Sequence, residues 1–145
     1  MMVSKDTLFE QLVSLIAASH QLHYELTKNL PKDDITPLQY EILEFLLVEQ
    51  PVTRSELSEC KGISLPNTSR EIKKLTDKGL CEKLDDAGDR RKQYIRLSAG
   101  GEARMKEWMA HMKQLFLLKV EDAQDAELAR ISEAMGVLSA TIFRE

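Results

Sequence analysis

The chain contains 145 residues, of which 43% are hydrophobic and 30% are charged, and this composition excludes an intrinsically disordered protein. Its longest apolar runs contain four residues, too few for a membrane span of about 20 or a signal-peptide core of about 7 to 15, so we expect one cytoplasmic unit over residues 1–145. The net charge of −4 is uneven: residues 53–97 hold 11 Lys and Arg against 8 Asp and Glu, while the rest holds 9 against 16. A basic middle segment in an acidic protein indicates a local anion-binding surface.

The first predicted element is a long amphipathic helix. From Asp6 to about Asn29, apolar residues recur every three or four positions, which is the spacing of one helix face. A second helix is expected to begin at Thr36 and Pro37, because a threonine hydroxyl caps a first turn and proline is tolerated where no N–H is needed. Pro51 ends this helix.

Two short helices follow and form a candidate helix-turn-helix. Residues Thr53 to Glu56 have the capping-box pattern of a helix start, and Gly62 marks the end of that helix. The next helix is expected to begin at Ser64 and to stop at Gly79 after a basic last turn. A tight turn containing Gly62 separates the two helices, as in helix-turn-helix motifs.

After Gly79 the apolar residues alternate with polar ones, and this pattern predicts a β-hairpin. We expect strands at residues 80–84 and 94–97, a turn over residues 85–89, and a loop that carries Arg90, Arg91 and Lys92. Another helix is expected from Ser98 and a last one from about Asp125, each with a broad apolar stripe.

Two helices followed by a basic hairpin predict a winged helix-turn-helix at residues 36–97. The expected fold class is therefore mainly α with a small β-hairpin wing, flanked by helical regions at residues 6–30 and 99–145. The apolar stripes of these flanking helices are broader than one small domain can bury, which favours a homodimer over a monomeric helical bundle. Two copies would place their recognition helices about 34–36 Å apart, which is one turn of DNA.

The polar face of the second helix suits a DNA groove, because a helix fits the major groove and a two-stranded ribbon reaches the adjacent minor groove. An ordinary solvated helix face is the alternative. The expected base contacts are Asn67, Ser69, Arg70 and Lys73. The expected phosphate contacts are Arg54, Ser64, Thr68, Lys74, Arg90 and Lys92.

The hairpin carries the pattern Asp89-Arg90-Arg91. An arginine at a wing tip can enter a narrow minor groove, where negative potential is concentrated, and Asp89 could orient Arg91 through a bidentate bond. A charged loop that serves solubility is the alternative, since exposed ion pairs contribute only about 0–1 kcal/mol. The adjacent helix-turn-helix favours the DNA-binding interpretation.

Three segments are similar to those of a known family. They are residues 35–43, residues 69–75 with the following Lys78-Gly79-Leu80, and Asp89-Arg90-Arg91 followed by residues 95–98. With them the chain resembles the MarR family of bacterial winged-helix transcriptional regulators over nearly its whole length. The resemblance implies a homodimer that binds a palindromic double-stranded DNA operator, usually as a repressor that a small molecule or an oxidant releases.

A possible small-molecule effector pocket is predicted where the helix after the wing faces the first helix. Methionines adapt to varied apolar ligands, but the same side chains would also serve in an ordinary dimer core. The candidate residues are Leu22, His23, Tyr24, Met105, Trp108, Met109 and Met112.

The sequence contains no motif of a catalytic or cofactor site, such as Gly-x-Ser-x-Gly, His-Glu-x-x-His or a phosphate-binding glycine loop. We therefore expect no enzyme, no catalytic residue and no cofactor. The three histidines match no metal-ligand set, and Cys60 and Cys81 are interpreted as packing residues. A metal-sensing or thiol-sensing regulator and a winged-helix module that binds protein remain as alternatives.

Overall fold

A computed structural model describes residues 2–32, 34–86 and 88–144, with the side chains at 86, 89, 90 and 91 outside the description. It contains two compact units, residues 1–112 and 113–145. The elements, in chain order, are α1 (Lys5–Thr27), α2 (Pro37–Glu49), β1 (Val52–Thr53), α3 (Arg54–Lys61), α4 (Leu65–Asp77), β2 (Cys81–Asp86), β3 (Asp89–Leu97), α5 (Ala99–Lys119) and α6 (Asp125–Thr141).

The predicted helix boundaries are confirmed because local capping sets them. The Thr36 hydroxyl accepts a hydrogen bond from the Gln39 backbone N–H at 3.1 Å, and the Thr53 hydroxyl accepts one from Glu56 at 3.1 Å. Gly62 ends α3 with a φ of 64°, in the left-handed region that favours glycine. The turn at Gly62 separates α3 from α4, the two helices of the helix-turn-helix.

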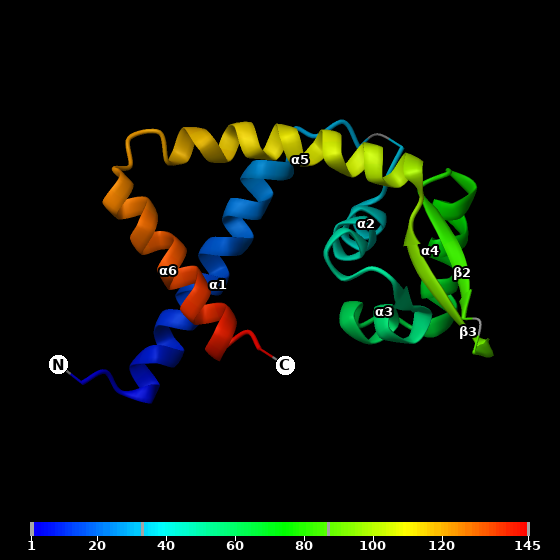
Figure 1. Ribbon diagram of the computed structural model, residues 1–145, viewed down its shortest axis with the longest axis horizontal. Helices are drawn as coiled ribbons and strands as arrows, with labels where there is room; N and C mark the ends of the chain where they lie inside the picture. The colour runs from blue at the N-terminus through cyan, green and yellow to red at the C-terminus, as the bar shows by residue number, and fades with distance from the viewer. Residues whose placement is uncertain (1, 33, 87, 145) are drawn as a thin grey trace. The chain divides into compact units, whose positions relative to one another are not determined.

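The sheet has the strand order β1-β3-β2 and is antiparallel throughout. Figure 1 shows β2 and β3 as a paired ribbon that extends beside α4. The predicted loop is wrong in extent: the strands continue to Asp86 and resume at Asp89, so Arg90, Arg91 and Lys92 belong to β3. The hydrogen bonds between paired strands join backbone groups only. Charged side chains therefore do not end an exposed two-stranded ribbon, although their composition suggests a turn.

The core of residues 1–112 is built from one face of each helix and strand of the winged module. The spacing of Ile72 and Leu75 on α4 points both side chains inward, and each is fully buried. Ile42 of α2, Leu57 of α3 and Ile95 of β3 are also fully buried. The mainly helical winged helix-turn-helix predicted from the sequence is confirmed.

The first turn of α5 lies against the backbone that follows α4. The Ser98 N–H donates to the Leu80 carbonyl at 3.1 Å, and the Ser98 hydroxyl donates to the Gly79 carbonyl at 2.5 Å. A Cβ at Gly101 would lie 2.0 Å from the Leu80 oxygen, so only glycine allows this approach. The start of α5 is thereby fixed to the winged module.

Large apolar side chains are exposed on both flanking helices. None of the helices in the described ranges is long and apolar enough to cross a membrane. The exposed residues of α1 include Leu8, Phe9, Val13, Leu15 and Ile16. Those of α6 and its C-terminal flank include Leu128, Ile131, Met135, Val137, Ile142 and Phe143. Exposed apolar surface of this kind is typical of protein interfaces.

Candidate nucleic-acid interface

The outer face of α4 carries most of the predicted base contacts. Ser64 is its N-cap and accepts from the Asn67 N–H at 3.2 Å. Asn67, Arg70, Lys73 and Lys74 are all exposed on the following turns, whereas Ile72 and Leu75 face the core. The unsatisfied N–H groups and the positive dipole end of this helix favour a phosphate near its start.

Thr68 requires a correction. It was expected to contact phosphate, but its exposed fraction is 0% and its hydroxyl donates to the Ser64 carbonyl at 3.0 Å. The reason is helical spacing: Thr68 lies four residues before Ile72, so both lie on the inward face. Thr68 belongs to the core rather than to the outer surface of α4.

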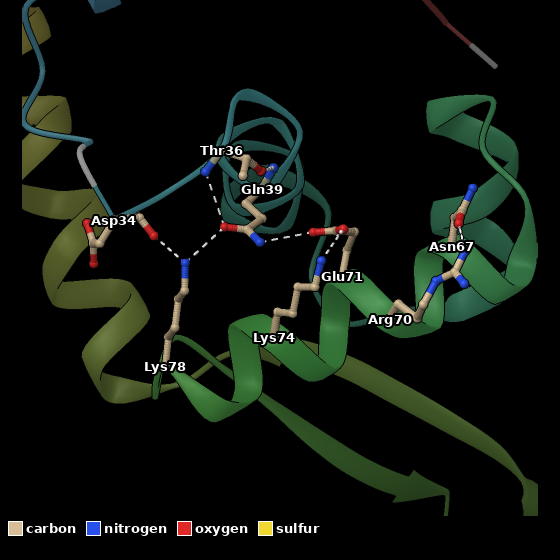
Figure 2. Close-up of polar contacts among 8 residues, drawn as sticks. All are labelled: Asp34, Thr36, Gln39, Asn67, Arg70, Glu71, Lys74 and Lys78. Atoms are coloured by element: carbon tan, nitrogen blue, oxygen red, sulfur yellow. Dashed lines mark hydrogen bonds and ion pairs between the residues drawn. The ribbon is translucent and has the colours of Figure 1, made fainter.

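The charged side chains of α4 are paired within the helix. Figure 2 shows the Arg70 guanidinium donating to the Asn67 side-chain oxygen, so these two predicted base contacts lie together. Lys73 lies 3.1 Å from Asp77, and Lys74 lies 3.3 Å from Glu71. Exposed pairs contribute about 0–1 kcal/mol, so both lysines can exchange these carboxylates for phosphate at little cost.

Gln39 joins the inner side of α4 to the start of α2 and was not predicted as a site residue. Its exposed fraction is 2%. Its amide donates to Glu71 at 3.0 Å, and its amide oxygen accepts from the Thr36 N–H at 3.2 Å and from Lys78 at 3.1 Å (Figure 2). All of its polar atoms are thus used, which satisfies a buried amide.

The same network continues to α5. The Lys78 ammonium donates to the Asp34 carbonyl (Figure 2). The Asp34 carboxylate accepts from both terminal nitrogens of Arg104, at 3.2 and 3.3 Å. Arg104 also lies over the Trp108 ring at 5.5 Å. The bidentate bond from Arg104 lowers the pKa of Asp34, and the network therefore connects α4 with the α1–α2 loop and α5.

Glu71 makes a pH-dependent contribution to stability that can be measured. Its pKa lies below the ordinary value of 4.5, chiefly because Gln39 donates to the carboxylate and secondarily because Lys74 is near. The contribution is therefore present above pH ~5 and is lost as the pH falls through the folded-state pKa. We expect the free energy of unfolding of the wild-type protein to exceed that of Glu71→Gln at pH 7, and this difference to shrink below pH ~4.5. Urea titrations from pH 7 to 3 test this, and a difference independent of pH would contradict it.

Arg54 does not point freely to solvent as a phosphate contact would. It is partly buried at the start of α3, where its guanidinium donates to Ser69 of α4 and to Gln93 of β3. A groove of about 590 Å³ lies among these elements, and Lys92 and Tyr94 also line it. The predicted base contact Ser69 is thus held by Arg54.

The wing itself is only partly described. Lys92 is exposed on β3, as a phosphate contact requires. The side chains of Asp89, Arg90 and Arg91 lie outside the described part of the structure, so the pairing of Asp89 with Arg91 stays a prediction. The backbone places all three in the first residues of β3, at the end of the ribbon distant from α5.

The residues predicted to line an effector pocket have different environments. Met105 and Trp108 belong to the core, Met109 and Met112 pack against it, and Tyr24 is exposed. His23 and Leu22 are partly buried. An effector pocket lined by these residues therefore stays a prediction.

The surroundings of Trp108 are polar on one side. The His23 ring nitrogen lies 2.8 Å from the Glu44 carboxylate, which also accepts from the Tyr40 hydroxyl at 2.8 Å. The Tyr40 and Trp108 rings are 5.4 Å apart. Within the described residues, Trp108 Nε1 is buried and has no hydrogen-bond partner. This indole N–H is available to an acceptor that could reach it.

The two cysteines differ in environment. Cys81 is buried, and burial raises the pKa of its thiol to about 12. Cys60 is exposed, and both are free thiols. Among the described residues, no three His, Cys, Asp or Glu side chains are grouped as metal ligands.

The chain is similar to known proteins in sequence and in fold. Residues 33–92 match the model of the MarR family. The HTH-type transcriptional regulator TcaR of Staphylococcus aureus is 27% identical over 133 residues, which cover 90% of this chain and 85% of TcaR. A solved MarR family protein from Bacillus stearothermophilus is 25% identical, with a TM-score of 0.74 and coverage of 99% of this chain and 100% of that one.

A second solved structure with this fold contains nucleic acid. A point mutant of MepR from S. aureus, bound to an oligodeoxyribonucleotide, matches with a TM-score of 0.60 and 18% identity over 97% of this chain and 99% of that one. At this identity the similarity shows a shared fold.

Proposed function

From the match of residues 33–92 to the model of the MarR family, we propose that this chain belongs to that family, binds double-stranded DNA and represses transcription. One observation carries the proposal: the exposed, mainly basic face of α4 lies beside a two-stranded wing whose β3 begins with Asp89-Arg90-Arg91. TcaR is a transcriptional regulator and MepR binds an oligodeoxyribonucleotide, which supports the same role here.

In the proposed complex, α4 enters the major groove and the wing enters the adjacent minor groove. Asn67, Arg70 and Lys73 contact base edges, with Arg70 suited to guanine O6 and N7. The N-terminus of α4 at Ser64 and the ammonium of Lys74 contact phosphates. The wing arginines follow the negative potential of a narrow minor groove.

A homodimer would bring two such modules to one palindromic operator. The exposed apolar residues of α1 and α6 support this assembly, because a second copy would remove them from water. Two-fold symmetry then repeats the half-site after about one helical turn of DNA.

We also propose that a small-molecule effector releases the protein from DNA. Trp108 Nε1, which has no hydrogen-bond partner among the described residues, and the adjacent His23–Glu44–Tyr40 cluster support a ligand with a hydrogen-bond acceptor near α1, α2 and α5. Such a ligand would release DNA by favouring a dimer in which the two α4 helices are wrongly spaced.

Selection of bound sequences from a random pool of duplex DNA tests the proposed function. We expect a palindrome whose half-site centres are separated by about 10 base pairs or a multiple of that spacing. Binding should also weaken steeply with salt, with log K falling by about 0.9 per phosphate contact for each unit of log[salt]. A protein-binding winged helix would enrich no palindrome and would show little dependence on salt.

Arg91→Ala is expected to weaken operator binding by about 1–3 kcal/mol, or roughly 5- to 150-fold, because an arginine in the minor groove is lost. Titration of labelled operator DNA measures the effect. Arg144→Ala removes the same charge outside the winged module and should leave affinity within about twofold. Normal binding by Arg91→Ala would show that the wing does not contact DNA in this way.

A further inference from the structure

Arg54 connects the two elements that are proposed to contact DNA. Its guanidinium donates through one terminal nitrogen to Ser69 Oγ of α4 at 3.3 Å and through the other to Gln93 Oε1 of β3 at 3.3 Å. The amide nitrogen of Gln93 in turn donates to Asp85 of β2 at 3.4 Å. Arg54 therefore links α4 to β3 directly and to β2 through Gln93.

The sheet register places Arg54 at this position. Thr53 of β1 pairs with Tyr94 of β3, so the next residue, Arg54, begins α3 close to Gln93. Gln93 pairs with Asp85 across the hairpin, which accounts for its second contact. Arg54, Ser69 and Gln93 are all partly buried, so these hydrogen bonds are less exposed to water than those on the outer face of α4.

The chemistry of arginine suits this role. Its planar guanidinium directs donors to two acceptors on different elements at once, whereas a lysine ammonium of the same charge has no such fork. Arg54, Ser69 and Gln93 all line the groove of about 590 Å³ that lies among these elements.

We infer that Arg54 is a positioning residue that sets the distance between the recognition helix and the wing. This inference rests on the proposed DNA-binding function and replaces the expectation that Arg54 contacts phosphate. The two elements enter adjacent grooves whose spacing the duplex fixes, so a displacement of either one removes contacts from the other.

Arg54→Lys and Gln93→Ala distinguish a positioning role of Arg54 from a phosphate contact. Arg54→Lys keeps the positive charge that a phosphate contact needs, and Gln93→Ala removes no charge. A positioning role predicts that each variant binds the selected operator about tenfold more weakly, the usual effect of losing a hydrogen bond to a charged group. It also predicts that the double variant binds the operator no more weakly than Arg54→Lys alone, since both substitutions break the same link between α4 and the wing. Hydroxyl-radical footprints should lose protection of the sugars along the minor groove beside the wing.

Three results would overturn the inference. They are wild-type affinity for Gln93→Ala, wild-type affinity for Arg54→Lys, and additive losses in the double variant, which would indicate separate DNA contacts. Thermal unfolding of each variant shows whether the fold is retained, and Gln93→Ala decides the question if Arg54→Lys is unstable. Failure of the wild-type protein to select any DNA sequence would overturn the proposed function itself, and the inference with it.

Discussion

Gly101→Ala is expected to destabilise the protein by about 3 kcal/mol or more, because a buried backbone contact leaves no space for a methyl group. The added Cβ would lie 2.0 Å from the Leu80 oxygen and 3.3 Å from a methyl carbon of Leu97. The Leu80 oxygen is a backbone atom that accepts from the Ser98 N–H, so it cannot move away without loss of that bond. Urea unfolding followed by circular dichroism measures the change.

Gly136→Ala provides the matched control. Gly136 lies in the interior of α6, where a Cβ would meet no atom of the described chain within 4 Å. Alanine has the higher helix propensity, so this change should stabilise α6 by about 0.5–1 kcal/mol. Equal stability of Gly101→Ala and the wild-type protein would contradict the close approach of α5 to Leu80.

Ile131→Asp is expected to convert the proposed homodimer to monomers and to weaken operator binding by roughly 100-fold, because loss of the second module removes the gain in effective concentration that two half-sites provide. The side chain is 41% exposed in the single chain, so the substitution costs the fold little. In a dimer interface the same carboxylate would be buried without a partner, which is strongly destabilising.

Sedimentation equilibrium and operator titration measure both effects. Val48→Asp is the control, because Val48 is an apolar residue with 75% exposure on α2, outside the flanking helices. This variant should remain dimeric. A dimeric Ile131→Asp protein would show that the exposed side of α6 does not form the interface.

Local patterns in the sequence were sufficient to predict the helices and their caps. The capping threonines and the left-handed Gly62 act within a few residues of one another, so their signals are readable without the fold. The inward positions Ile72 and Leu75 followed from helical spacing alone. These features made the winged helix-turn-helix predictable.

Features that depend on distant residues were not predictable in this way. The two-residue strand β1 exists only because β3 lies beside it. The bonds of Gln39 with Glu71, and of Arg54 with Gln93, join residues 32 and 39 positions apart. Thr36 and Gln39 do form the Ser/Thr-x-x-Glu/Gln capping box, a pattern that could have indicated a structural role for Gln39. No local pattern indicates that Gln39 also bonds with Glu71 and Lys78.

The contrast between the two thiols has a practical consequence. At neutral pH a maleimide dye should attach to the accessible sulfur on α3 and spare the one within the sheet, whose proton is held too firmly for attack. The natural chain thus supplies a single attachment point for fluorescence within the helix-turn-helix, without any engineered cysteine. Energy transfer from that dye to labelled duplex would follow the proposed binding and release of DNA in real time.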